Sequence, residues 1–173
     1  MSSHQVLRPL IQADFSLYDE IQRHAYRDEF LESAGALERK IEAFARGCWI
    51  VEIGRHPAAY LIAHPWISRS IVSLDAEPFV IPSAPNCFYI HSLTVHRGWQ
   101  RQGLGRMLAR KAFDIARCAN LGTITLVSVQ QSDAFWRHIG FRFIVPDHPD
   151  ICEQLQHYGP DAKFMTCMLP GRV

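Results

Sequence analysis

The sequence predicts an α/β fold whose sheet is mixed but mostly antiparallel and is flanked by helices. Residues 48–53 and 58–66 are apolar runs separated by a tight turn, which predicts an antiparallel hairpin. Residues 123–129 form a continuous β-branched run, typical of a strand buried on both faces. Residues 103–119 carry apolar side chains at helical spacing. At 173 residues the chain can bury one core, so we expect a single domain over residues 1–173.

The other elements follow from capping residues and hydrophobic periodicity. Asp14 can cap a first helix in which Tyr18 and Ile21 share one face, and Gly47 is a typical C-terminal cap for a second helix. The expected sheet has six to seven strands. The sequence contains no internal repeats and no linkers. In chain order we expect a strand at 5–11, helices after Asp14 and at 33–46, strands at 48–53, 58–66 and 88–95, a helix at 103–119, a strand at 123–129, a helix at 132–138, and strands at 141–145 and 162–169.

Two connecting segments could border a binding site. Residues 27–32 are acidic, which fits a solvated connection, or else one wall of a pocket that attracts a cationic amine. Residues 68–87 contain three prolines and no periodicity, and a loop of this length is commonly functional; we interpret it as a substrate lid. His64, near the end of the preceding strand, could face the site, although capping a strand end is the commoner role.

Composition excludes several classes of function. The chain is 48% apolar and 20% charged with a net charge of +1, so we expect no nucleic-acid partner; the basic residues gather locally between 97 and 111. No apolar run approaches ~20 residues and the first residues lack a signal peptide's core, so we expect no membrane partner and a cytoplasmic location. Five scattered cysteines without a CxxC pair indicate buried reduced thiols, and nine histidines without HExxH predict no metal site.

The most informative stretch joins a strand to the long helix. The strand ends at Leu93-Thr94-Val95, and Gln100-Arg101-Gln102-Gly103-Leu104-Gly105-Arg106 leads into the helix. Glycines there allow a ligand to approach the backbone, and the helix start offers unpaired N–H groups and the positive end of its dipole. Together with the surrounding arginines, these features predict a phosphate-binding turn.

Two common phosphate-binding motifs do not fit this turn. Gly98 and Gly103 have the spacing of a Walker loop, but Leu104 and Gly105 stand where Lys and Ser or Thr are required. A dinucleotide fingerprint needs a third glycine where this chain has Leu108. What remains is Q-x-x-G-x-G after a strand.

This pattern resembles motif A of the GCN5-related N-acetyltransferases, whose loop binds the pyrophosphate of acetyl-coenzyme A. Residues 132–141, SDAFWRHIGF, resemble a second signature of that family, a short helix that ends before Gly-Phe and the next strand. Within the family, YIHSLTVHRGWQRQGLG is similar to the arylalkylamine acetyltransferases. The resemblance implies a sheet that splays at the acyl-coenzyme A site, where the cofactor's amides pair with the strand at 93–95. The implied cofactor contacts are Leu93, Thr94, Val95, Gln100, Arg101, Gln102, Gly103, Leu104, Gly105, Arg106, Gln130, Ser132 and Phe135.

The same resemblance assigns chemical roles. An N–H near Leu93 would stabilise the thioester oxygen. His91 is the candidate base, because it alternates with Tyr89 and Leu93 and imidazole accepts a proton near neutral pH; a core histidine bonded to a carbonyl is an equally weighted interpretation. Many members have a tyrosine acid where this chain has Trp136, whose indole cannot release a proton. Tyr158 or Tyr89 could replace it, and we name Tyr158.

The resulting hypothesis is an N-acetyltransferase that uses acetyl-coenzyme A and a primary amine of a small molecule or peptide, by direct attack in a ternary complex. A homodimer is an additional expectation, because members of the family often pair. A catalytically weak acyl-coenzyme A sensor is the first alternative. A nucleotide-binding protein with an unusual loop, preferring ATP or NAD, is the second.

Overall fold

The computed structural model describes residues 4–170, which form a seven-stranded sheet in the order β1-β2-β3-β4-β5-β7-β6. Strands β4 and β5 are parallel, whereas β1–β2, β2–β3, β5–β7 and β6–β7 are antiparallel. The predicted mixed, mostly antiparallel sheet is therefore confirmed. Its elements are β1 (Gln5–Pro9), α1 (Phe15–Ala25), α2 (Ala34–Phe44), β2 (Cys48–Ile53), β3 (His56–Trp66), β4 (Cys87–Val95), α3 (Leu104–Cys118), β5 (Thr123–Ser128), α4 (Asp133–His138), β6 (Arg142–Phe143), α5 (Pro149–Gln156) and β7 (Lys163–Met168).

The chain divides into two compact units. Unit 1 comprises residues 1–63, 74–80 and 92–112, and unit 2 comprises residues 64–73, 81–91 and 113–173. Strands β3 and β4 and helix α3 each contribute residues to both units.

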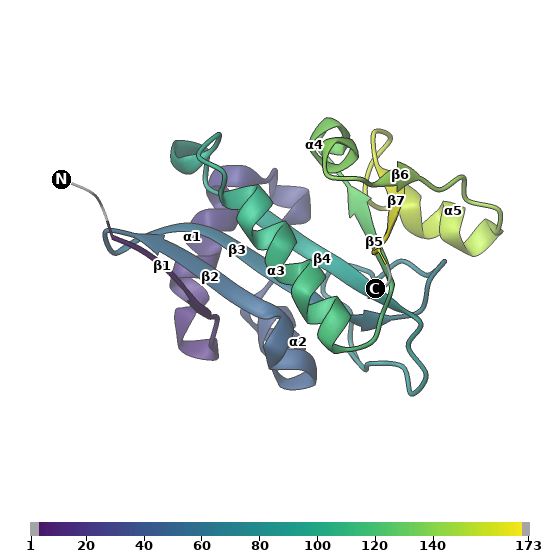
Figure 1. Ribbon diagram of the computed structural model, residues 1–173, viewed down its shortest axis with the longest axis horizontal. Helices are drawn as coiled ribbons and strands as arrows, with labels where there is room; N and C mark the ends of the chain where they lie inside the picture. The colour runs from purple at the N-terminus through teal and green to yellow at the C-terminus, as the bar shows by residue number, and fades with distance from the viewer. Residues whose placement is uncertain (1–3, 171–173) are drawn as a thin grey trace. The chain divides into compact units, whose positions relative to one another are not determined.

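In unit 1, helices α1 and α2 cover one face of the strands, and the first part of α3 lies on the other (Figure 1). The core under α1 and α2 is apolar and includes Tyr18, Leu37, Ile50 and Tyr60, each at most 2% exposed. On the α3 side, the Lys111 ammonium lies 3.6 Å from the centre of the Trp49 ring. The alternation of Trp49 and Ile50 on β2 thus places one residue against each layer of helices.

In unit 2, β5, β7 and β6 carry α4 and a small aromatic core. Trp136 of α4 meets Phe141 edge-on at 5.2 Å, and Phe113 meets the same ring at 6.2 Å. Gly140 ends the α4 segment with φ +105°, a conformation that glycine adopts without strain. The parallel pairing of β4 with β5 joins Phe88–Ile90 to Ile124–Leu126, although both strands continue beyond it. The parallel pairing thus covers three residues of each strand.

Several local expectations differ from the structure. The expectation that Gly47 caps α2 is wrong, since Gly47 is the buried last residue of a 3-10 turn. Only glycine fits there, because a Cβ would lie 1.7 Å from the Ala63 carbonyl oxygen. Between β6 and β7 lies helix α5, Pro149–Gln156, in a stretch for which the sequence patterns above predicted no helix. All five cysteines are free as predicted, but Cys118 and Cys152 are exposed rather than buried.

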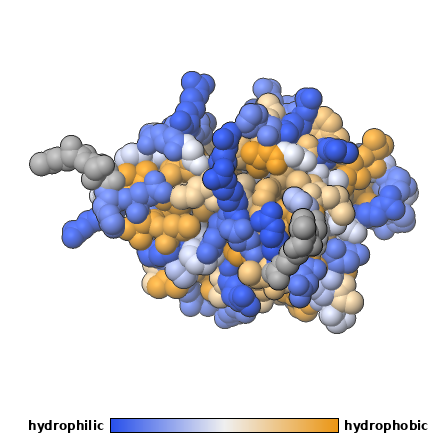
Figure 2. All heavy atoms as spheres, viewed as in Figure 1, coloured by the Kyte–Doolittle hydropathy of each residue, from blue (hydrophilic) through white to orange (hydrophobic). Residues whose placement is uncertain are grey.

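The surface seen from the α3 side mixes hydrophilic and hydrophobic residues (Figure 2). The polar stripe of α3, with Arg106, Arg110 and Asp114, is exposed, as its helical spacing predicted. Among the helices of residues 4–170, none has the length and apolar character needed to cross a membrane.

Candidate active site

The predicted phosphate-binding turn lies in unit 1 between β4 and α3. The Gln100 side-chain amide reaches back and donates to the Val95 carbonyl oxygen over 3.3 Å. Helix α3 begins at Leu104, and a 3.0 Å bond runs from the Met107 N–H to the Gly103 carbonyl. The N–H groups of residues 104–106 therefore precede that first intrahelical bond and point toward the turn. The turn thus presents backbone donors at the positive end of a 15-residue helix.

The backbone of this turn adopts left-handed conformations at two positions, Arg101 with φ +63° and Gly103 with φ +85°. A Cβ at Gly103 would meet no atom within 4 Å, so glycine is needed there for its backbone angles and not for space. The open volume beside Gly103 leaves room for a ligand to approach the backbone. Leu104 is 2% exposed and anchors the turn, whereas Arg101, Gln102 and Arg106 are exposed.

The end of β4 that leads into this turn has two distinct faces in unit 1. Ser92 and Thr94 point toward a group of hydroxyls: Ser92 donates to the Tyr60 oxygen over 3.1 Å, and Thr94 donates to the Tyr26 oxygen over 2.9 Å. Leu93 alternates with them and is half-buried. The peptide of Leu93, expected to supply the oxyanion donor, is thus held on both sides by polar anchors.

His91 lies in unit 2 within a cluster of aromatic rings. Its ring centre is 6.1 Å from that of His64 and 6.2 Å from that of Tyr89, and His64 stacks on Tyr89 at 5.6 Å. His64 is 1% exposed, and its Nδ1 lies 3.1 Å from the Pro65 carbonyl oxygen. His64 is thus a neighbour of the candidate base, and its position in the strand beside β4 was the only sequence signal for that contact.

The segment between β5 and α4 is a second compact turn of unit 2. Gln130 and Gln131 are left-handed, with φ +51° and +60°, and the Ser128 and Ser132 hydroxyls are 3.0 Å apart. Gln130 is exposed, and Phe135 is half-buried with its ring centre 4.9 Å from that of Trp136. Gln130, Ser132 and Phe135, the second group of cofactor contacts predicted from sequence, lie in or directly after this turn.

Comparison with known families settles the classification of the chain. The model of the acetyltransferase (GNAT) family matches residues 10–141, a span that includes the turn at 100–106 and the β5–α4 segment. The chain belongs to the GNAT acetyltransferase family. No curated protein matches the sequence.

Solved structures show the same fold at low sequence identity. The loading GNATL domain of CurA from Lyngbya majuscula has a TM-score of 0.74 at 12% identity, covering 95% of this chain and 98% of that one. Ard1 from Thermoplasma volcanium has a TM-score of 0.71 at 12% identity, covering 96% and 99%. The PaiA N-acetyltransferase from Thermoplasma acidophilum, in complex with coenzyme A, has a TM-score of 0.68 at 13% identity, covering 95% and 99%.

Trp136 stands where the family resemblance led us to expect a tyrosine acid. Trp136 is 5% exposed and packs between Phe135 and Phe141, so it fills the core of unit 2. Tyr158 is 8% exposed, and its hydroxyl donates to the carbonyl oxygen of Val72. In unit 2 this bond links Tyr158 to residues 68–73, which belong to the segment 68–87 that the sequence predicts to be a substrate lid.

The described residues contain no group of three or more His, Cys, Asp or Glu side chains that could hold a metal ion. The candidate site residues that contact one another do so through hydrogen bonds and ring contacts. In unit 1 the turn at 100–106 is bonded to the end of β4. In unit 2 His91 lies with His64 and Tyr89, and Ser132 lies with Ser128.

Proposed function

We propose that this GNAT protein transfers an acetyl group from acetyl-coenzyme A to a primary amine, by direct attack in a ternary complex. Family membership supports acyl transfer from an acyl-coenzyme A, and the choice of acetyl group and amine acceptor is our proposal. One observation carries it: left-handed Gly103 opens the backbone next to the first N–H groups of α3. Such a turn suits a pyrophosphate.

The cofactor would supply an acyl thioester, and the chain would hold it mainly through its backbone. The peptides of residues 93–95 would bond the amides of the pantetheine arm, and the Leu93 N–H would donate to the thioester oxygen as it gains negative charge. The proposed cofactor contacts are Leu93, Thr94, Val95, Gln100, Arg101, Gln102, Gly103, Leu104, Gly105 and Arg106 of unit 1, and Gln130, Ser132 and Phe135 of unit 2.

His91 is the proposed base. An alkylammonium titrates near ~10, so the amine needs to lose a proton before it can attack at neutral pH. The half-buried His91 ring lies beside Tyr89 and His64, and an imidazole is suited to that proton transfer.

Tyr158 is the proposed acid for the departing thiolate. Its hydroxyl donates to Val72, so it would have to exchange that bond for one to sulfur. This observation also favours the alternative function, an acyl-coenzyme A sensor with weak turnover, because Trp136 cannot serve as the acid.

The acceptor is proposed to be a cationic amine. Of the acidic residues in the connection between α1 and α2, Asp28 and Glu29 are exposed, whereas Glu32 is buried against Lys40. Two exposed carboxylates on one short 3-10 turn, Asp28–Phe30, would attract such a substrate.

The first experiment measures thermal unfolding with acetyl-coenzyme A, ATP or NAD, and then thiol release with a panel of primary amines. At 100-fold above its Kd, a ligand of the folded state adds ~2.7 kcal/mol. We expect stabilisation by acetyl-coenzyme A alone and thiol release with at least one cationic amine. Stabilisation without thiol release would favour the sensor, and stabilisation by ATP or NAD instead would overturn both proposals.

Two variants then test the assigned roles. His91→Gln should lower kcat by about 10²- to 10⁴-fold and leave the stabilisation by acetyl-coenzyme A intact. Tyr158→Phe should lower kcat in the same way if the hydroxyl is the acid. If Tyr158→Phe lowers only the unfolding temperature, its bond to Val72 is structural and the acid lies elsewhere.

A further inference from the structure

Four hydroxyl groups meet on one face of β4 in unit 1. The Thr94 hydroxyl donates to the Tyr26 oxygen over 2.9 Å, the Ser92 hydroxyl donates to the Tyr60 oxygen over 3.1 Å, and the Ser92 and Thr94 oxygens are 3.1 Å apart. The Tyr26 and Ser92 oxygens are 3.5 Å apart, which closes the group. We call Tyr26, Tyr60, Ser92 and Thr94 the hydroxyl cluster.

The cluster is partly buried, with Tyr26 and Ser92 half-buried. Thr94 is 2% exposed and Tyr60 is fully buried. Burial raises the pKa of the Tyr26 and Tyr60 phenols, so both hydroxyls keep their protons at neutral pH. Buried hydroxyls are costly unless they are hydrogen-bonded, and here each oxygen has a partner within the cluster. Apolar side chains could fill the same volume without needing hydrogen-bond partners. The network of directional hydrogen bonds instead fixes the relative positions of the four residues.

The position of the cluster on β4 indicates which part of the backbone it holds. Ser92 and Thr94 are the two neighbours of Leu93, and both side chains are bonded to tyrosines from other elements. Tyr60 comes from β3. Tyr26 follows α1 directly, where its N–H bonds the Gln22 carbonyl over 2.7 Å. Because both neighbours of Leu93 are held by this hydrogen-bond network, we expect the backbone on each side of Leu93 to be rigid.

We propose that the hydroxyl cluster is a positioning device that aims the backbone N–H of Leu93, with Tyr26 and Thr94 as its chief positioning residues. The proposal rests on the proposed function, in which that N–H stabilises the thioester oxygen. Such stabilisation depends on donors that are oriented before the reaction, and small misplacements reduce kcat strongly.

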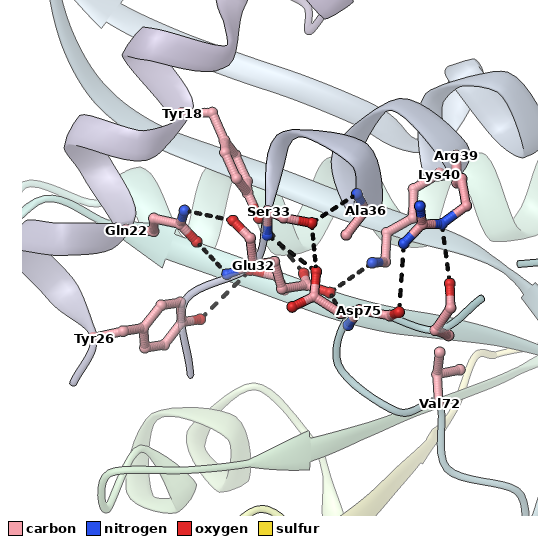
Figure 3. A network of polar contacts seen from close by, with 12 residues as sticks. Tyr18, Gln22, Tyr26, Glu32, Ser33, Ala36, Arg39, Lys40, Val72 and Asp75 are labelled. Atoms are coloured by element: carbon pink, nitrogen blue, oxygen red, sulfur yellow. Dashed lines mark hydrogen bonds and ion pairs between the residues drawn. The ribbon is translucent and has the colours of Figure 1, made fainter. Parts of the chain in front are cut away.

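The cluster also joins the acceptor side of the protein to β4. Tyr26 begins the connection between α1 and α2, where Gln22 holds Glu32 by two bonds of 2.9 and 3.0 Å (Figure 3). The Tyr18 hydroxyl lies 3.5 Å from the Glu32 carboxylate, and the centre of its ring lies 4.5 Å from that of the tilted Tyr60 ring. The segment proposed to receive the amine is thereby tied, through these tyrosines, to the strand that carries Leu93.

The test compares Tyr26→Phe and Thr94→Val with Thr125→Val, which makes the same exchange at a residue 1% exposed on β5. We measure kcat, KM for acetyl-coenzyme A, the unfolding temperature, and the NMR order parameter of the Leu93 amide in the apo protein. A rigid amide has an order parameter near ~0.85. We expect Tyr26→Phe and Thr94→Val to lower kcat about tenfold with KM within about twofold, and to lower the Leu93 order parameter. Thr94→Ser should restore both values, and Thr125→Val should change neither.

The outcomes separate this proposal from the proposed function. Unchanged kcat and an unchanged Leu93 order parameter in Tyr26→Phe and Thr94→Val would overturn the positioning role. An equal loss of kcat in Thr125→Val would also overturn it, since the effect would then be general destabilisation. If the wild-type protein released no thiol with any amine, the proposed function would fail. The Leu93 order parameter would then decide the positioning role alone: a lower value in the variants upholds it, and an unchanged value overturns it.

Discussion

His96 stands at the start of the segment that leads from β4 to the turn at 100–106, where we propose that the pyrophosphate binds. Its Nδ1 accepts the Gly98 N–H over 3.0 Å, and its ring lies 4.2 Å from the His24 ring. Burial and the nearby His24 lower the pKa of His96, while Glu20 acts in the opposite direction. An imidazole protonated at Nδ1 cannot accept the Gly98 bond, so the neutral ring is the form that holds this turn.

This geometry predicts a pH dependence of stability. Because the pKa of His96 is lower in the folded state, the unfolded chain takes up the proton first as the pH falls from about 6.5. Stability should therefore decline as the pH drops below that value and level off once the folded state is also protonated. His96→Asn keeps an acceptor for Gly98 without titrating, so urea unfolding between pH 7 and pH 5 should show a shallower decline. An unchanged slope would contradict this.

Gly103 allows a sharper residue-level test because a matched control exists. A Cβ at Gly103 or at Gly122 meets no atom within 4 Å, but only Gly103 has a positive φ. Gly103→Ala should destabilise the protein by about 1 kcal/mol or more and weaken acetyl-coenzyme A binding, whereas Gly122→Ala should do neither. Chemical denaturation and a binding titration measure both effects, and equal behaviour of the two variants would disprove the requirement for left-handed backbone.

At the scale of elements, the start of α2 is held by a buried ionic network (Figure 3). The Lys40 ammonium lies 2.6 Å from the Glu32 carboxylate, and their side chains are 2% and 4% exposed. The same carboxylate accepts the Asp75 N–H over 3.2 Å, and Asp75 accepts from the backbone N–H and the hydroxyl of Ser33 over 3.0 and 2.7 Å. Within unit 1, residues 74–80 are thus fastened to α2.

Lys40→Met is expected to destabilise the protein strongly. It leaves the Glu32 carboxylate buried without its cation, which typically costs about 3–5 kcal/mol. The double variant Glu32→Gln/Lys40→Met should recover part of that loss, since no charge remains buried. Arg117→Met, which removes the exposed Arg117–Asp114 pair, is the control and should have a much smaller effect. Urea unfolding of the wild type, the two Lys40 variants and Arg117→Met measures the free energy of unfolding. A loss in Lys40→Met no larger than that in Arg117→Met would refute this prediction.

Patterns local in sequence predicted the elements well, and contacts between distant residues escaped prediction. The strand Cys48–Ile53 has the predicted bounds, and helix Leu104–Cys118 lies within one residue of them, because period-2 and period-3.6 patterns and a glycine mark both. The expected strand at 141–145 is reduced to Arg142–Phe143, which pairs only with β7. The hydroxyl bond between Tyr26 and Thr94 joins residues 68 positions apart, and no local pattern encodes it.

The candidate site likewise combines features that local sequence predicts with features that depend on contacts between distant residues. The turn at 100–106 was found from sequence because glycine and a helix start are local signals. The pairing of His64 with His91 and the engagement of Tyr158 with Val72 depend on which strands and loops meet in the fold. The acid in particular could not be chosen from residue type, because a tyrosine's partner decides whether its proton is available.

At the scale of the whole molecule, the two compact units share elements. Neither unit is a continuous stretch of chain, and β3, β4 and α3 each run from one into the other. Independent domains are usually connected by exposed linkers that few contacts cross. Because β3, β4 and α3 contribute to both units, unfolding of one unit would disrupt part of each of these elements in the other.

We therefore predict one cooperative unfolding transition, as expected for a single domain. Differential scanning calorimetry should give a calorimetric enthalpy equal to the van't Hoff enthalpy, and fluorescence and far-UV circular dichroism should yield coincident curves. Saturating acetyl-coenzyme A should move the whole transition upward, because a ligand that binds only the folded protein raises the free energy of unfolding of the entire cooperative unit. Two separate transitions, or an upward shift confined to one part of a biphasic curve, would show that the units unfold independently and that the single-domain prediction is wrong.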